Sequence, residues 1–195
     1  MDKLKYSIFD LFSYTLPGAF VLSSIILINY SKDFCCEEFI LIDFIKENLN
    51  IYSSILFIIG SYLSGFITNF FGSYYLKFFM LISPVPEPKY SKLSNSEKYV
   101  LIREFSPINF EYVEKWNSLK AMCSNFAMVI LLSSIFLFLL VSCFSYLHLI
   151  LGSLISIISL LISRRFHKWS IIDLDNTIHL FNLDTHSKTF FSNQK

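Results

Sequence analysis

The sequence has few charged residues. Asp, Glu, Lys and Arg make up 16% of its 195 residues, against about 25% in a typical soluble domain, and hydrophobic residues make up 54%. These four residue types are absent from three long runs, residues 11–31, 48–76 and 121–163. Runs of this length exceed what a soluble core needs. The composition therefore excludes a soluble enzyme, a disulfide-rich secreted domain and a disordered chain.

Catalytic and metal-binding motifs are also missing. The sequence has no C-x-x-C pair and no G-x-S-x-G elbow. The nearest candidates for a metal site, or for the acid and histidine of a lipid-modifying enzyme, are Asp173, Asp175 and His179. A solvated tail with an aspartate helix cap explains the same residues. We therefore expect no enzyme activity, no metal and no cofactor. The absence of charge within the runs also disfavours an ion-coupled transporter.

The lengths of the uncharged runs predict four membrane spans. A hydrocarbon core of about 30 Å takes about 20 helical residues to cross, so the run at 121–163 holds two spans joined by a tight turn. The predicted segments are an interfacial segment with the first span at 1–31, an outer amphipathic loop at 32–48, the second span with a cytoplasmic extension at 49–82, a linker with cytoplasmic helices at 83–120, the third span at 121–142, the fourth at 143–163, and a tail at 164–195 that packs on the cytoplasmic helices.

The basic residues predict the topology. Fourteen of the 16 Lys and Arg residues lie in the N-terminal segment, the loop at 77–120 or the tail, whereas the loop at 32–47 is acidic. Basic flanks stay cytoplasmic, so both termini and the long loop are expected inside. The predicted fold class is an all-α integral membrane protein with four transmembrane helices and an extended cytoplasmic helical layer. The residue usage is typical of an AT-rich bacterial genome, which indicates the bacterial inner membrane.

Proline and capping residues predict where the helices begin and end. Pro17-Gly18 starts or kinks the first span, after a short interfacial helix over 2–12, and the three prolines of 84–88 stop the second. Ser94 and Glu97 have capping-box spacing and open a helix to about residue 105. Pro107 opens a further helix that meets no breaker before the third span.

Small and hydroxylated residues recur at helical spacing within two of the spans. Such a stripe either lets helices approach closely or lines a water-filled pathway for ions in an oligomer. We keep both interpretations for the residues of the fourth span and of the second span, which are Gly152, Ser156, Ser159 and Ser163, and Ser61, Gly65 and Asn69.

A basic and aromatic collar follows the fourth span. Charge and stacking together favour binding of an anionic lipid headgroup, a nucleotide or a short nucleic acid, and the alternative is the ordinary positive-inside flank of a membrane protein. Lys98, Lys115 and Lys120 are further candidates from the helical layer. The main candidate residues are Arg164, Arg165, Lys168, Trp169 and Arg103.

The adjacent Cys35 and Cys36 lie in the predicted outer loop. They form either an intermolecular disulfide between two copies or two small apolar positions at the membrane surface.

The general layout resembles the compact membrane effectors of bacterial anti-phage defence, of which the Hailong type is one. The resemblance rests on four uncharged spans, Pro17-Gly18, the inner helices around Pro84-Val85-Pro86, and Arg164-Arg165. It implies a homo-oligomer in the bilayer that forms a gated ion-permeable pore and depolarises the cell under control of a cytoplasmic nucleotide or oligonucleotide. The competing interpretation is a non-conducting membrane scaffold that docks a partner protein.

Overall fold

The structure is a computed structural model that describes residues 2–31, 50–86, 90, 92–141 and 144–185. Within these ranges all regular structure is helical. The helices are α1 (Asp2–Ser31), α3 (Ile51–Ile82), α4 (Asn95–Phe105), α5 (Pro107–Leu140) and α6 (Tyr146–Leu180). The predicted outer loop, with Cys35 and Cys36, lies outside the described residues, as does the end of the tail.

Three helices, α3, α5 and α6, are long and apolar enough to cross a membrane, and α1 contributes a shorter apolar segment at Phe12–Ile28. The protein is therefore all-helical and membrane-embedded in character. The fourth predicted span corresponds to α6 and the third to α5, while the first falls within α1.

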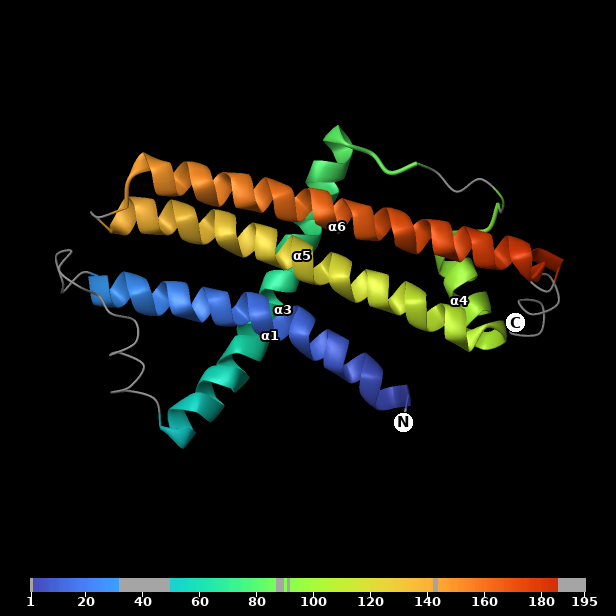
Figure 1. The fold of residues 1–195 in the computed structure, drawn as a ribbon, viewed down its shortest axis with the longest axis horizontal. Coiled ribbons are helices and arrows are strands. Elements are labelled where there is room, and N and C mark those ends of the chain that lie inside the picture. Colours follow the sequence, from blue (N-terminus) through green and yellow to red (C-terminus); the bar gives the residue numbers. More distant parts are fainter. Residues whose placement is uncertain (1, 32–49, 87–89, 91, 142–143, 186–195) are drawn as a thin grey trace.

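The long helices form a layer that one helix crosses. Helices α1, α5 and α6 run side by side, and α3 crosses them steeply, so that both of its ends project beyond the layer (Figure 1). The amino ends of α1 and α5, the carboxyl end of α6 and α4 lie toward one end of the molecule (Figure 1). The turn between α5 and α6 lies at the opposite end (Figure 1).

Local sequence signals set most helix boundaries. The capping box predicted at Ser94 and Glu97 is confirmed: Ser94 Oγ accepts the Glu97 N–H, and the Glu97 carboxylate accepts the Ser94 N–H at 2.8 Å. These hydrogen bonds from Ser94 lower the pKa of Glu97, because they stabilise its charged form. The prediction that Pro107 opens an unbroken helix is also confirmed.

The prediction of a separate interfacial helix over 2–12 is wrong, because α1 is continuous from Asp2 to Ser31. Of the two alternatives predicted for Pro17-Gly18, a helix start is excluded, and α1 bends near its middle (Figure 1). Proline removes one backbone hydrogen bond, and the contact of this segment with α3 holds the helix together across the gap. Helix α6 continues past residue 163, the predicted end of the fourth span, to Leu180, and the continued part packs against α4 and α5. The span boundary itself stays a prediction.

Glycine permits the close crossing of α1 and α3. A Cβ atom on Gly18 would overlap the carbonyl oxygen of Ser61, and one on Gly65 would overlap the carbonyl oxygen of Tyr14. The two backbones therefore touch directly, as in the small-residue crossings of membrane helices.

Farther along α3, Leu76 forms a small buried cluster with Ala127 of α5 and Leu160 of α6, partly covered by aromatic residues of α3.

We expect Gly65→Ala to destabilise the protein by roughly 1–3 kcal/mol, the usual cost of overpacking, because the new methyl group meets backbone that cannot retreat. The control is Gly60→Ala, whose Cβ would lie 3.1 Å from the movable Leu22 Cδ1. Thermal unfolding of the detergent-purified variants measures the difference. Equal melting temperatures for the two variants would show that the crossing is not as tight as described.

Candidate functional site

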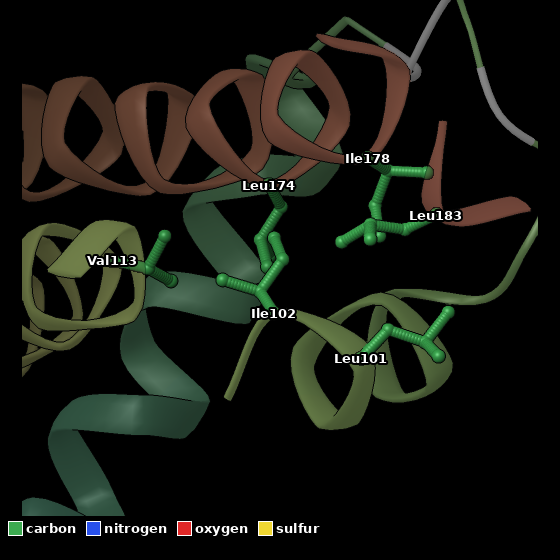
Figure 2. Packing of buried hydrophobic residues seen from close by; sticks show 6 residues of the cluster. All are labelled: Leu101, Ile102, Val113, Leu174, Ile178 and Leu183. Carbon is green, nitrogen blue, oxygen red and sulfur yellow. The ribbon is translucent and has the colours of Figure 1, made fainter. Parts of the chain in front are cut away.

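An apolar cluster fixes α4 to the extended ends of α5 and α6. The cluster is buried almost completely and draws on three helices and the turn after α6 (Figure 2). The first part of the predicted tail therefore packs on α4 and α5 through Leu174, Ile178 and Leu183, as expected. The members are Leu101 and Ile102 from α4, Val113 from α5, Leu174 and Ile178 from α6, and Leu183.

A buried ion pair joins the same elements. Lys98 is fully buried, and its Nζ atom lies 2.6 Å from Asp175 Oδ1. The other carboxylate oxygen of Asp175 accepts the backbone N–H of Tyr90 at 2.8 Å, and the Tyr90 ring stacks on His179 at 4.6 Å between centroids. A charge buried away from water needs an opposite charge and hydrogen bonds to offset its lost hydration. Asp175 has both, from Lys98 and from the Tyr90 N–H. We call these residues the Lys98–Asp175 latch.

The latch corrects two sequence interpretations. Lys98 points into the protein and pairs with Asp175, so it is not available to an external ligand. Asp175 is neither a solvated tail residue nor a helix cap, because it lies inside α6 and is buried. Its acidic neighbour Asp173 accepts a hydrogen bond from Trp116 Nε1 at 2.8 Å.

Arg164 binds the carboxyl end of α3. Its Nε atom donates to the carbonyl oxygen of Ser83 at 2.7 Å, and its terminal nitrogen donates to that of Pro84 at 2.6 Å. Carbonyl groups at the end of a helix lack intrahelical donors, and a cation there also complements the helix dipole. Arg164 thus ties α3 to α6, and its predicted contact with a ligand stays a prediction.

The collar also contains three packed aromatic rings, which we call the aromatic platform: Trp116 of α5, and Phe166 and Trp169 of α6. Trp116 lies 5.8 Å from Phe166 and 5.0 Å from Trp169 between ring centroids. Arg165 lies over Trp169 at 4.6 Å and Lys115 lies over Trp116 at 5.6 Å, and both cations are exposed. The platform therefore carries one exposed cation over each of its two tryptophan rings.

The other two basic candidates differ from this pair. Lys168 is half-buried on α6, whereas Arg103 is exposed on a different helix, α4. The predicted collar thus separates into one cation that the fold uses and others that stay accessible.

The hydroxyl stripe of α6 faces α5 within the same chain. Ser156 Oγ donates to the carbonyl oxygen of Ala127 at 2.7 Å and lies 3.3 Å from the Tyr75 hydroxyl. Ser163 Oγ donates to the carbonyl oxygen of Lys120 at 2.8 Å. Both serines are fully buried. Each hydroxyl finds an acceptor on the neighbouring helix, which fixes the register of α5 against α6.

The remaining stripe residues lie at helix contacts as well. A Cβ atom on Gly152 would overlap Ser134 of α5, while Ser159 is half-buried. On α3, Ser61 Oγ donates to the carbonyl oxygen of Phe57, and Gly65 touches α1. Within one chain these positions serve helix packing, and the pore-lining interpretation stays a prediction about an assembly.

Asn125 is a partner of Asn69 that the sequence did not single out. Its side-chain nitrogen donates to Asn69 Oδ1 at 3.3 Å, and Gly72 leaves the space that Asn125 occupies. Asn125 is fully buried, and its Oδ1 atom finds no hydrogen-bond partner among the described residues. An amide pair inside an apolar bundle favours one helix register, because a shift would leave more polar atoms unpaired.

His167 lies on α6, near Lys120 of α5 and just beyond the uncharged run. Its Nδ1 atom is buried without a hydrogen-bond partner in the described part of the chain. Burial, together with the neighbouring Lys120 charge, lowers the pKa of His167 to about 4. Burial also lowers the pKa of Lys120, against the opposing effect of Glu114. Sequence reasoning grouped His167 with the exposed collar, because its position in the sequence alone does not separate it from those residues.

We expect Lys98→Met to lower the free energy of unfolding by about 3–5 kcal/mol, because it leaves the Asp175 carboxylate buried without its cation. Adding Asp175→Asn removes that charge while keeping an oxygen for the Tyr90 N–H, so the double variant should recover much of the loss. Chemical denaturation of the full-length protein measures both, with the exposed Lys92→Met as control. An unchanged stability of Lys98→Met would contradict the latch.

We also expect stability to fall as the pH is lowered from about 6.5 toward 4. In this window the unfolded chain protonates His167 while the folded chain does not, so protons favour unfolding. The loss is at most about 1.4 kcal/mol per pH unit for one proton, and the partial exposure of the ring reduces it further. The His167→Gln variant should show a flatter pH profile, and His148→Gln should not.

Comparisons with protein-family models, with curated proteins and with solved structures find no match to this chain. Within the described residues, no group of three or more His, Cys, Asp or Glu side chains is placed to hold a metal ion.

Proposed function

We propose that the protein is an oligomeric membrane effector in anti-phage defence, whose copies together form a gated ion-permeable pore that depolarises the cell. In this proposal both termini are cytoplasmic, four helices cross the bacterial inner membrane, and a nucleotide or oligonucleotide on the cytoplasmic side controls opening. The chain is expected to have no enzyme activity of its own.

The uncovered side of α3 carries the proposal. Only Ser61, Gly65, Gly72 and Leu76 of this helix are buried, and three of these four residues are Ser or Gly. The opposite face shows large apolar side chains: Leu63, Ile67, Phe70 and Tyr74 are each more than half exposed. In a single embedded chain this face would meet lipid, and the proposal assigns it to neighbouring copies instead.

A pathway for ions would then lie between copies. Within one chain the hydroxyl groups of Ser156 and Ser163 already bond to α5, so they do not line an open channel. Four spans are also too few to enclose a water-filled path. Several copies arranged around an axis remove this limit, and the crossing helix α3 is the element that reaches farthest from the layer (Figure 1).

Gating would act through α6, because both α4 and the carboxyl end of α3 are bonded to this helix. The latch holds α4 to α6 through Asp175, and Arg164 holds the carboxyl end of α3 to the same helix. A ligand that moves α4 would therefore bias both α6 and α3. Such a ligand shifts the equilibrium only by its difference in affinity for the closed and open states.

The test uses voltage-sensitive dye in bacteria on induced expression, together with the oligomer size of the purified protein. Wild-type protein should depolarise the cells and purify as an oligomer. The double variant Ile67→Ala, Phe70→Ala should reduce both signals severalfold, because it removes contact area from the uncovered face of α3 without adding charge. The matched control is Leu151→Ala, Ile155→Ala on the exposed face of α6, which should retain both.

Two results would contradict the proposal. One is a monomeric wild-type protein whose liposomes never leak. The other is full depolarisation by a variant that no longer forms oligomers.

A non-conducting scaffold is the second candidate, and the filled serine stripe favours it. Ser156, Ser163 and Gly152 already contribute to packing inside one chain, so they need no water-filled path to explain them. In this case α4 and the exposed ends of the cytoplasmic layer would dock a partner protein. Wild-type expression would then leave the membrane potential unchanged, whatever the oligomer size of the purified protein.

A further inference from the structure

Arg165 stands at the end of an apolar stripe on the outside of α6. Leu154, Ile158 and Leu161 precede it at spacings of four, three and four residues, which places all four side chains on one helix face. The three apolar side chains are 50%, 55% and 49% exposed, respectively. This stripe runs along the uncharged part of α6 and stops two residues after the uncharged run ends.

The aromatic platform makes the end of this stripe a defined site rather than a single charge. Trp169 lies beneath Arg165, and Trp116 lies beneath Lys115. The two indole rings are 5.0 Å apart between centroids and meet edge to face, with 61° between their planes, so each cation lies over its own ring of one packed aromatic cluster. The bond from Trp116 Nε1 to Asp173 holds the platform in place. A guanidinium stacked on a ring keeps its N–H donors in plane and directed outward.

These two cations also keep their charge available. Among the described residues, neither Arg165 nor Lys115 pairs with a carboxylate, whereas Lys98 pairs with Asp175 and Arg164 bonds to backbone carbonyl groups. Half-buried Lys168 follows Arg165 by three residues, which places it on the neighbouring surface of the helix. The fold thus uses some of the collar internally and leaves Arg165 and Lys115 facing outward.

We propose that the aromatic platform with Arg165 and Lys115 binds the headgroup of an anionic phospholipid, whose acyl chain lies along Leu154, Ile158 and Leu161. The phosphate accepts hydrogen bonds from the guanidinium, and the tryptophan rings lie at the headgroup level. A free nucleotide offers the same phosphate but no acyl chain for the stripe, which favours the lipid. This inference rests on the proposed function only in that the helices are embedded in a bilayer.

The chain supplies its own probe, because its 2 tryptophans both belong to the platform. Full-length protein is reconstituted in phosphatidylcholine vesicles that contain a small fraction of phospholipid brominated near the headgroup. Brominated phosphatidylglycerol should quench the tryptophan fluorescence at a mole fraction about fivefold or more below that needed for brominated phosphatidylcholine, since each basic residue at a membrane surface contributes about a fivefold preference.

Variants separate this site from a general attraction to negative charge. Arg165→Gln and Lys115→Gln should each reduce the preference about fivefold, while Arg165→Lys should keep part of it. The matched control Arg103→Gln removes an exposed cation from α4 and should change nothing. Unchanged quenching by brominated phosphatidylcholine shows that each variant is still folded and embedded.

Three outcomes would overturn the inference. Equal quenching by the two brominated lipids in the wild-type protein excludes an anionic lipid site but leaves the pore proposal intact. Release of phosphatidylglycerol by soluble inorganic pyrophosphate, lost in Arg165→Gln, would assign the site to a free phosphate ligand instead. Absence of quenching by either lipid would show that the platform is not at a bilayer surface, and would contradict both proposals.

Discussion

The constraint behind this structure is that a polar group removed from water costs free energy unless it finds a partner within the protein. In the uncharged runs, Ser156 and Ser163 bond to carbonyl groups of α5, and the side-chain nitrogen of Asn125 donates to Asn69. The same rule operates where α4 packs on α6, because the buried Lys98 there pairs with Asp175. Each such pair fixes the register of two helices, and apolar side chains then fill the space between them.

Helix α6 gains its central role from these pairs. It bonds to α5 along the membrane part, holds the end of α3 through Arg164, and carries Asp175 of the latch. Because the helix is unbroken from Tyr146 to Leu180, a movement at α4 and a movement at the membrane part are mechanically joined. This arrangement suits a protein that reads a cytoplasmic event and responds in the bilayer, which is the function we propose.

Much of the fold follows from local sequence patterns. Runs without charge predict the long apolar helices, and the capping box at Ser94 predicts the start of α4, because both depend on neighbours within a few residues. Local patterns did not predict how far two of the helices continue. Helix α1 runs on through Pro17, where it packs against α3, and α6 runs on past residue 163 to an apolar cluster with α4 and α5.

The sequence by itself determined that this chain is helical and apolar enough for a membrane, and that small, hydroxylated and basic residues gather on particular helix faces. Only the tertiary structure decided which of those faces meet. In the folded protein the serines of α6 face α5, and Lys98 and Arg164 bond to partners within the protein. Arg165 and Lys115 stay exposed over two tryptophans. The physical reason is that helical periodicity places residues on a face, whereas the partner of that face depends on contacts between segments far apart in the chain.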